Sequence, residues 1–572
     1  MNYFRFPPKA YWNTARQDED SINYIRNLID CHPIIAKMLA NRNITAIADI
    51  KNFFSTDLSK ITPPWKIKDM DKACKRIYQA IIQDEKILIF GDYDADGITS
   101  VSILYLFLKP YCKNLIYFIP NREKDGYGFS SHHIQTFKAK GINLIITVDC
   151  GSSNSEAIKL AKNEKIDTIV TDHHKISVPP PHAVAVLNPQ RKDCHSRLTH
   201  LAGVGVVFYL LIQLRKEFRE KNFFTKIPEP NLAQFLDLVT IGTIGDMVPL
   251  VKENRIFAKA GLQSMRKKPR PSLSSLMKLS YIDPKTISSQ DIAFQIAPRL
   301  NSPGRMKDAT ICVEMICSKD KKKIGEISDY LNRLNNLRKE KENLIVFQAE
   351  KKIKKSSLDN IIILDSEDWP QGILGTAAAK LTKKFNRPCI LFNDGGKILK
   401  GSARSIKGFS IFECLNNFSF LFESFGGHDQ AAGISINKKN IDKFKQKVKE
   451  FSQKNMNQSM LIPVHEAESI ILFDDFSPDL FKELDEFEPF GTANTFPLFI
   501  AKKIIIESHI TIKNIHHKLS LFQPQCVKQN RLKAMLFNFH EEIPKHLSQA
   551  LIKPATGDRS QNGTDVFIEA ME

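Results

Sequence analysis

Seven acidic and imidazole side chains with metal-binding chemistry stand in four short motifs of this 572-residue chain. They are Asp94 and Asp96 in GDYDADG (91–97), Asp149 in VDCG (148–151), Asp172, His173 and His174 in TDHH (171–174), and Asp246 in GTIGD (242–246). If they converge, so many anionic groups would repel one another unless cations neutralised them. Carboxylate oxygens with one or two imidazoles suit Mn²⁺ or Mg²⁺ better than a structural zinc. The chemistry indicated is that of a two-metal hydrolytic site.

The elements that must position these groups are strands of a parallel sheet. The first three motifs directly follow short runs of aliphatic and β-branched residues at 87–90, 144–148 and 168–170. Such runs are typical of buried parallel strands, and open α/β sheets bind ligands just outside the carboxyl ends of their strands. A lone aspartate there would more often cap a helix, but the clustering reverses that preference. For Asp92 we keep the role of a turn-capping or supporting residue, with direct ligation left open.

The pattern along the chain predicts several folding units. Helix and strand signals alternate from about residue 71, with a tight turn expected at GDYDADG and a helix expected from Thr99 to Leu108, which indicates a doubly wound α/β domain. A charged, Pro-free stretch with apolar residues at helical spacing predicts a long linking helix. Short alternating strands near the end, among them 503–506 and 509–512, predict a small β-barrel. The expected divisions are a helical lead-in (1–60), the doubly wound domain (61–320), the linking helix (321–355), a second, smaller α/β domain (356–461) and the barrel (462–572).

The amino-acid composition limits the class of substrate and the cellular compartment that we expect for this protein. The chain has 82 Lys and Arg against 63 Asp and Glu, a formal net charge of +19. A basic protein around an acidic centre suggests a polyanion such as nucleic acid, although compositional bias in the coding DNA would also give many lysines. Ten scattered cysteines without a CxxC pair indicate reduced thiols. With no apolar leader and no run of ~20 apolar residues, we expect a cytoplasmic protein that does not contact membranes.

Ten motifs, in order, resemble those of the DHH phosphoesterase family and, within it, the RecJ single-strand-specific exonucleases. They are GDYDADGITS, VDCG, TDHH, NP (188–189), LAGVGVVF (201–208), GTIGDMVPL (242–250), APRLNSPGR (297–305), GSARS (401–405), FGGHDQAAG (425–433) and FEPFGTANTFP (487–497). The resemblance covers about residues 70 to 560. It implies that the doubly wound sheet is a DHH catalytic domain, the second α/β domain a DHH-associated substrate-binding domain, and the barrel an OB-like domain that binds nucleic acid.

The same resemblance implies roles for individual residues. The first metal would be bound by Asp94 and the second by Asp96, His173 and Asp246, with Asp149 bridging the two. His174 would contact the scissile phosphate or protonate the leaving oxygen, and Asp172 would orient the histidines. The phosphate-binding residues implied are Arg122, Ser402 and Arg404 for the 5′-terminal phosphate, and Asn301, Arg305 and His428 for its neighbours. One departure is Phe90, which stands where much of the wider family has a histidine, so we expect weak binding of the first metal.

The function implied is a 5′→3′ exonuclease that uses Mn²⁺ or Mg²⁺ to hydrolyse single-stranded DNA to mononucleotides in repair and recombination. The implied partners are single-stranded DNA with a 5′ end, a single-strand-binding protein and a helicase, and we expect a monomer. One alternative is a DHH phosphoesterase of short oligonucleotides, against which residues 462–572 argue. Another is a catalytically inactive scaffold of replication or repair, against which the complete ligand set argues. A small-molecule metallophosphatase fits neither the length nor the charge.

Overall fold

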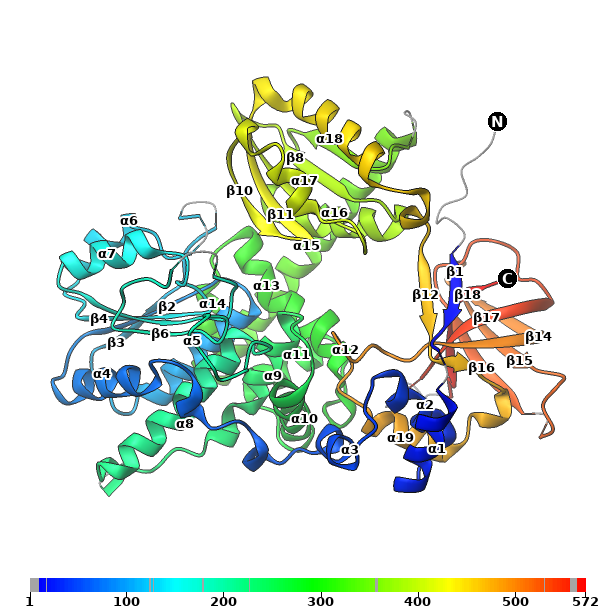
Figure 1. Cartoon of the computed structure of the whole chain (residues 1–572), viewed down its shortest axis with the longest axis horizontal. Coiled ribbons are helices and arrows are strands. Elements are labelled where there is room, and N and C mark those ends of the chain that lie inside the picture. The colour runs from blue at the N-terminus through cyan, green and yellow to red at the C-terminus, as the bar shows by residue number, and fades with distance from the viewer. Residues whose placement is uncertain are drawn as a thin grey trace. The chain divides into compact units, whose positions relative to one another are not determined.

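The computed structural model describes residues 10–572 except 17, 123–124, 127, 177–178, 226, 355–357, 529 and 556–562. The chain forms two compact units (Figure 1). The larger is made of Thr14–Asn332 and Ala467–Glu572, and the smaller of Arg333–Glu466 with the N-terminal segment that ends at Asn13.

A five-stranded parallel sheet forms the first part of the larger unit. Its strands are β2 (Ile87–Gly91), β3 (Leu115–Phe118), β4 (Leu144–Val148), β5 (Asp167–Thr171) and β6 (Ala185–Leu187). The helices around it are α4 (Met70–Ile82), α5 (Ala95–Leu108), α6 (His132–Ala139), α7 (Ser155–Asn163) and α8 (Gly203–Glu220). Ile87 and Ile89 share a core with α4, α5 and α8, whereas Leu88 and Phe90 share another with α6 and α7 (Figure 1). Helices cover both faces, so the predicted doubly wound sheet is confirmed.

The strand order, β3-β2-β4-β5-β6, creates a crevice at one sheet edge. After β2 the chain adds β3 on one side and then crosses to add β4 on the other. Such a reversal is a topological switch point, where open sheets bind ligands beyond the carboxyl ends of the strands. The GDYDADG and VDCG motifs follow β2 and β4 and so begin at this crevice.

Helices make up the remainder of this half of the larger unit. They are α9 (Leu236–Gly245), α10 (Lys252–Lys267), α11 (Pro271–Leu279), α12 (Ser289–Asp291), α13 (Ala297–Met306) and α14 (Thr310–Cys317). Helix α9 packs against α5, α8 and α10 and is buried along its whole length. The predicted linking helix is α15 (Lys321–Lys354), which begins in the larger unit and ends in the smaller; residue 355, its predicted end, lies outside the described residues.

The smaller unit contains a mixed sheet in the order β10-β11-β9-β8-β7. Its elements are β7 (Ile362–Ser366), α16 (Gln371–Phe385), β8 (Cys389–Asn393), β9 (Ile398–Arg404), α17 (Ile411–Asn416), β10 (Phe422–His428), β11 (Ala431–Asn437) and α18 (Ile441–Asn455). Phe392, Ile436 and Phe444 lie in the core on one sheet face, and α16 packs against Leu391 on the other. A second α/β fold was predicted here and is confirmed. A two-stranded sheet pairs β1 (Tyr11–Thr14) with β12 (Val464–Ala467).

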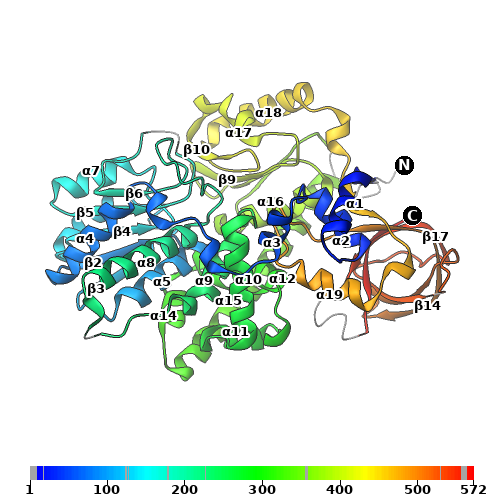
Figure 2. The same ribbon diagram turned by 60° about the horizontal axis from the view of Figure 1, so that its bottom comes forward.

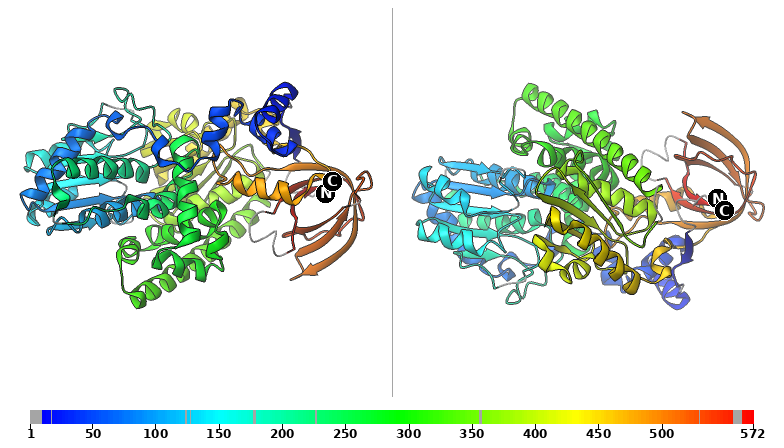
Figure 3. Two further views of the ribbon diagram at one scale, coloured as in Figure 1. Left: turned by 90° about the horizontal axis from the view of Figure 1, so that it is seen from below. Right: turned by 90° about the horizontal axis from the view of Figure 1, so that it is seen from above.

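The C-terminal part of the larger unit is a five-stranded barrel, which Figure 3 shows as a strongly curved sheet. Its strands are β14 (Phe499–Ile512), β15 (His516–Phe522), β16 (Arg531–Leu536), β17 (His546–Pro554) and β18 (Val566–Met571), with β13 (Ser469–Ile470) beside β14. The prediction of two strands at 503–506 and 509–512 is wrong, because both belong to β14. The first half of β14 pairs with β17 and the second with β15, and a register shift between Ile506 and Ser508 bends the strand so that the barrel closes.

The predicted N-terminal lead-in consists of β1 and three helices. They are α1 (Glu19–Leu28), α2 (Pro33–Asn41) and α3 (Ile47–Phe54). Ile25, Leu39 and Phe53 share one hydrophobic core with the barrel and with α19 (Pro478–Glu486) (Figure 2). In the part of the chain that the structure describes, no helix combines the length and the apolar character that a membrane span requires.

Candidate metal centre

Asp94 lies at the junction between β2 and α5. It is the N-cap of α5, and its carboxylate accepts hydrogen bonds from the backbone N–H groups of Asp96 (3.0 Å) and Gly97 (3.1 Å). We expected a turn here and a helix from Thr99, which is wrong, because the N-cap satisfies the first free amide groups and the helix begins at once. The start of one helix therefore carries Asp94 and Asp96, two of the three carboxylates of the motif.

Asp96 is buried in the first turn of α5 and faces the start of α8. Its two carboxylate oxygens accept hydrogen bonds from the backbone N–H groups of Gly203 (2.7 Å) and Val204 (2.8 Å). A Cβ on Gly242 of α9 would lie 2.8 Å from the nearer oxygen of Asp96. Two of the sequence motifs, LAGVGVVF and GTIGDMVPL, thus supply the backbone donors and the space that this carboxylate needs.

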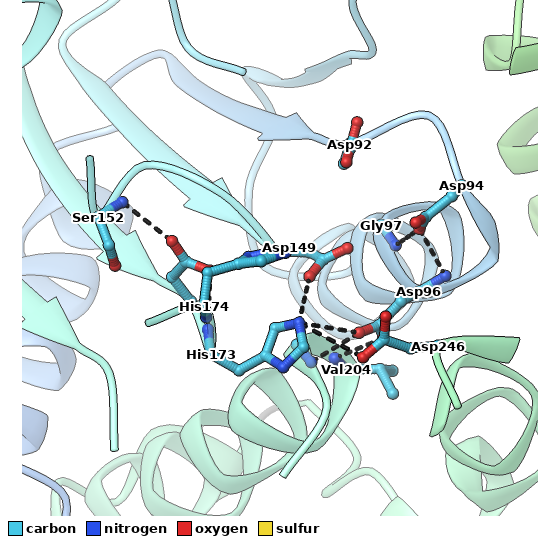
Figure 4. A network of polar contacts seen from close by, with 12 residues as sticks. Asp92, Asp94, Asp96, Gly97, Asp149, Ser152, His173, His174, Val204 and Asp246 are labelled. Atoms are coloured by element: carbon cyan, nitrogen blue, oxygen red, sulfur yellow. Dashed lines mark hydrogen bonds and ion pairs between the residues drawn. The ribbon is translucent and has the colours of Figure 1, made fainter. Parts of the chain in front are cut away.

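The imidazole of His173 stands among three carboxylates (Figure 4). Its Nε2 is 3.2 Å from Oδ1 of Asp149, 3.5 Å from Oδ2 of Asp246 and 3.8 Å from Oδ2 of Asp96. Asp149 follows β4 in a left-handed backbone conformation (φ 60°), and Asp246 is the C-cap of α9. All five predicted metal ligands, including Asp94, are brought to this crevice from β2, β4, β5 and α9.

Two buried atoms of this centre lack hydrogen-bond partners among the described residues. They are Oδ1 of Asp149 and Nε2 of His173. Ligand atoms lie within 4.8 Å of one another in three overlapping groups, which are Asp96 with His173 and Asp246, Asp92 with Asp94 and Asp149, and Asp149 with His173 and His174. Buried polar atoms without partners are costly, and cations bound in this crevice would satisfy them. The donor set, mostly carboxylate oxygen, fits Mn²⁺ or Mg²⁺.

Burial and mutual repulsion keep protons on this centre when no cation is present. Burial first, and then the neighbouring carboxylates, raise the pKa of Asp149 and of Asp246 well above the ordinary value. The same causes raise the pKa of Asp96 to about 7 and that of Asp92 to about 8. Cations must displace these protons, so their affinity rises with pH.

Asp172 is buried beneath the two histidines. Its Oδ1 accepts hydrogen bonds from Nδ1 of His174 (2.8 Å) and from the backbone N–H groups of His173 (2.7 Å) and His174 (3.1 Å), and its Oδ2 accepts from the backbone N–H of Ser152 (2.9 Å). Although burial opposes it, the hydrogen bond from His174 holds the pKa of Asp172 below its usual range. Asn188 of the NP motif donates to Ser152 Oγ (2.8 Å) and to the carbonyl of His174 (3.0 Å), which ties the two loops together.

Two residues, Phe90 and Asp92, affect which side chains could bind the first metal. Phe90 is buried and packs against Phe118 and Phe129, with ring centroids 5.7 and 5.1 Å away, so it belongs to the core. Asp92 accepts a hydrogen bond from the backbone N–H of Tyr93 (2.7 Å), which fits the turn-capping role, but it also belongs to one of the ligand groups, with Asp94 and Asp149. The close spacing of the three aspartates in DYDAD was the sequence signal for this third carboxylate. Its position in a ligand group with Asp94 and Asp149 supports direct binding of a metal by Asp92.

The predicted phosphate-binding residues of the larger unit lie around Tyr93. The Arg122 guanidinium is 5.7 Å from the Tyr93 ring centroid. Arg305 is on α13, where a Cβ on Gly304 would lie 2.4 Å from the carbonyl oxygen of Tyr93. Asn301 of the same helix accepts a hydrogen bond from the backbone N–H at the start of α5 (2.6 Å). Glu123, Lys124 and Tyr127 of the motif that contains Arg122 lie outside the described residues.

The predicted phosphate-binding residues of the smaller unit share one sheet face. Arg404 lies opposite Ala431 on β11, which lies opposite His428 on β10, and Ser402 lies opposite Gly433. Arg404 Nη1 donates to the carbonyl of Ala403 (2.8 Å). A Cβ on Gly433 would meet no atom within 4 Å, so the face is open at β11, whereas at β9 it lies against α16, where a Cβ on Gly375 would be 2.9 Å from Nη2 of Arg404.

Comparisons with known proteins agree with this architecture. Three family models match: the DHH family N-terminal domain at residues 86–243, the DHHA1 domain at 358–454 and the RecJ OB domain at 468–555. The single-stranded-DNA-specific exonuclease RecJ of Bacillus subtilis is 32% identical over 532 residues, which are 91% of this chain and 66% of that protein. That of Salmonella typhimurium is 32% identical over 504 residues, 84% of this chain and 86% of that protein.

Among solved structures, RecJ of Thermus thermophilus in complex with Mn²⁺ has the same fold, with a TM-score of 0.81 and 22% identity over 98% of this chain and 79% of that chain. The same protein has also been solved in complex with Mg²⁺. The three domain models follow one another in the order that the motifs predict, and the Salmonella relative is matched over most of its length. The chain therefore belongs to the RecJ family of DHH proteins.

Proposed function

We propose that this protein is a metal-dependent exonuclease that hydrolyses single-stranded DNA from its 5′ end. The observation that carries the proposal is the position of His173, whose buried Nε2 lies within 3.8 Å of oxygens of Asp149, Asp246 and Asp96. The RecJ relatives, named as single-stranded-DNA-specific exonucleases, support the substrate class. Hydrolysis to mononucleotides in DNA repair is part of the same proposal.

Two divalent cations fit the donor atoms. Asp94, with Asp92, would hold the first, and Asp96, His173 and Asp246 the second, with Asp149 shared between them. Such a pair supplies an activated water and neutralises charge on the phosphate. The amide groups of Gly203 and Val204 keep the Asp96 carboxylate in position.

His174 holds the proton that the leaving oxygen requires. Although burial opposes it, the hydrogen bond from Nδ1 to Asp172 raises the pKa of His174 to about 9. The imidazole is therefore protonated at neutral pH, and its side chain is 45% exposed. With Nδ1 bound to Asp172, Nε2 is the atom that donates to the phosphate or to the leaving oxygen.

Positively charged and neutral polar side chains of both units would bind the DNA backbone. We assign Arg122, Ser402 and Arg404 to the 5′-terminal phosphate, since an arginine fork binds phosphate oxygens in pairs. Asn301, Arg305 and His428 would contact neighbouring phosphates. A terminal-phosphate site accounts for cleavage that proceeds from an end, and the OB domain would add contacts to the single strand. A single-strand-binding protein and a helicase are the proposed protein partners.

The test is product analysis on a 5′-phosphorylated single strand a few tens of nucleotides long, with its duplex as control, in Mn²⁺, Mg²⁺ or EDTA. Metal-dependent release of mononucleotides from the 5′ end of the single strand, abolished by Asp149→Ala, is the expected result. Cleavage of only very short fragments would replace the proposal by a short-oligonucleotide phosphoesterase. Binding without cleavage would replace it by a scaffold.

A further inference from the structure

A second group of metal-binding side chains lies at the start of α6 and shares no member with the centre described above. It consists of Asp125, His132 and His133, each of which offers one ligand atom within 4.8 Å of the others. Oδ1 of Asp125 is 3.6 Å from Nε2 of His132 and also 3.6 Å from Nε2 of His133. The centroids of the two imidazole rings are only 3.9 Å apart.

His133 is the observation that points to a ligand. It is 5% exposed, and neither of its ring nitrogens has a hydrogen-bond partner among the residues that the structure describes. Apart from Asp125 and His132, the aromatic neighbours of the ring offer no hydrogen-bonding group: it packs against Phe90, Phe118 and Phe137 with centroids 5.3 to 5.7 Å away. At 3.6 Å from Asp125 its Nε2 is beyond hydrogen-bond distance. A buried imidazole in this state is costly unless something binds it.

The spacing of the three atoms is that of a metal coordination sphere. Tetrahedral zinc binds imidazole nitrogen and carboxylate oxygen at about 2.0–2.2 Å, which places adjacent ligand atoms roughly 3.3–3.5 Å apart. Both distances from Asp125 Oδ1 are close to this value. A direct ion pair of Asp125 with one histidine would instead bring the two within hydrogen-bond distance and leave the other histidine aside.

In Asp125 and in His132, the polar atom that does not face the common centre has a hydrogen-bond partner of its own, as is usual for metal ligands. Oδ2 of Asp125 accepts a hydrogen bond from the backbone N–H of Asn121 (2.7 Å). Nδ1 of His132 is 2.9 Å from Ser130 Oγ. These contacts orient the carboxylate and the imidazole and direct Oδ1 and Nε2 toward the common centre.

We propose that Asp125, His132 and His133 form a binding site for Zn²⁺ or a similar late first-row divalent cation. Two imidazoles and one carboxylate favour such a cation over Mg²⁺, whose preferred ligands are oxygens. The cation would join Asp125, whose backbone N–H donates to the carbonyl of Asn121 (2.8 Å), to the first turn of α6. Arg122 directly follows Asn121 in the sequence, so the cation would also help to fix the position of a proposed phosphate-binding residue, a consequence that rests on the proposed function.

The test is a zinc titration of the full-length chain in excess Mg²⁺, which competes with zinc for the carboxylate-rich centre, and the Asp149→Ala variant disables that centre. The other variants are His132→Asn and, as a matched control, His182→Asn at an exposed histidine of the same unit. One zinc per chain is expected in Asp149→Ala, and the wild type and the control should bind zinc at the proposed site with the same affinity. His132→Asn is expected to weaken zinc binding at least about tenfold, because even replacing a residue that only orients a metal ligand lowers the metal affinity by about that factor. Equal binding by His132→Asn, or loss of the zinc in Asp149→Ala, would overturn the proposal.

A second variant, His133→Phe, separates metal binding from folding. Phenylalanine suits the aromatic surroundings of His133, so the variant is expected to fold and to unfold at or above the wild-type temperature without zinc. Zinc should raise the unfolding temperature of the wild type, because it binds only the folded chain, and should leave His133→Phe unchanged. An equal zinc-dependent rise in both would refute the site. Neither readout depends on nuclease activity, so failure here is distinct from failure of the proposed function.

Discussion

Asp172 accepts a hydrogen bond from Nδ1 of His174 at 2.8 Å, and this contact decides when the imidazole carries a proton. Despite the opposing effect of burial, it raises the pKa of His174 to about 9, against an ordinary value of about 6.5. Because the pKa is raised, the protonated form is complete at neutral pH and is lost only as the pH rises through about 9.

Replacement of Asp172 by asparagine should therefore move the alkaline limit of catalysis. In Asp172→Asn the pKa of His174 falls toward about 6.5, so the rate should begin to fall above that pH and be about 10- to 100-fold lower at pH 8. Single-turnover rates measured against pH check this, with Asp193→Asn, at a surface aspartate paired with Arg191, as control. An unchanged profile would show that His174 does not act through its proton.

The metal-free centre should make stability fall as pH rises. The pKa values of Asp96 and Asp92, about 7 and about 8 in the folded chain, lie above the ordinary carboxylate value of about 3.9. The folded chain then binds more protons at these two groups than the unfolded one. Their contribution to stability is fully present below the ordinary carboxylate pKa and is lost as the pH rises through about 7 and about 8.

Denaturant unfolding in EDTA at about pH 5.5 and about pH 8 measures this loss, and Mn²⁺ should reverse it at the higher pH. Asp149→Asn removes one of the repelling carboxylates. It should stabilise the metal-free chain at the higher pH by about 1–3 kcal/mol while abolishing cleavage. Higher metal-free stability of the wild type at the alkaline pH would contradict the account.

Gly203 should tolerate no side chain. A Cβ there would lie 2.5 Å from Oδ1 of Asp149, so Gly203→Ala must displace a proposed bridging ligand. The expected loss is about 10- to 100-fold in Mn²⁺ affinity or rate. The matched control is Gly205→Ala on the same helix, where the nearest atom to the new Cβ is the end of the Leu201 side chain at 3.3 Å. Equal effects of the two substitutions would count against a specific role for Gly203.

Arg404 should distinguish strands by their 5′ ends. If its guanidinium binds the terminal phosphate through two oxygens, Arg404→Lys should raise KM for a 5′-phosphorylated strand by about tenfold or more. KM for the 5′-hydroxyl strand should change little. Lys407→Ala removes a positive charge at an exposed lysine just after the same strand and is the control for general electrostatic attraction of the strand. A uniform increase of KM for both strands would assign Arg404 to general backbone binding.

The two metals should bind with unequal affinity. Phe90 leaves the first metal without an imidazole, whereas His173 serves the second, so Mn²⁺ titration of the free protein should resolve one tight and one weak event. A non-hydrolysable single strand should tighten the weak event, because its phosphate oxygens complete the coordination. Two equally tight events without DNA would refute this.

Features that depend on a local sequence pattern could be predicted, whereas features that depend on contacts between distant residues could not. The strands before Asp94, Asp149 and His173 were predictable because buried parallel strands have continuous apolar runs, and the sheet topology then brings their ends together. The start of α5 was mispredicted because the N-cap role of Asp94 depends on which amide groups its side chain meets. The continuity of β14 was missed because its two halves pair with different strands, which no local pattern reveals.

The contacts that surround the ligands were not predictable at all. Nothing in the spacing of residues 96 and 203 indicates that the carboxylate of Asp96 accepts from the first amide groups of α8. The role of Asn188 likewise appears only when its loop folds against His174. Such hydrogen bonds join residues far apart in the chain, so only the tertiary structure discloses them.

The proposed metal ligands lie far apart along the chain, which affects when the metal centre can form during synthesis of the protein. Asp94 and Asp246 stand 152 positions apart (246 − 94), and the carboxylate of Asp96 is held by α8, which lies between them. A nascent or truncated polypeptide that ends before Asp246 carries an incomplete centre. A nascent chain of the proposed nuclease therefore cannot assemble the proposed metal centre, and cannot cut DNA with it, until Asp246 has been synthesised.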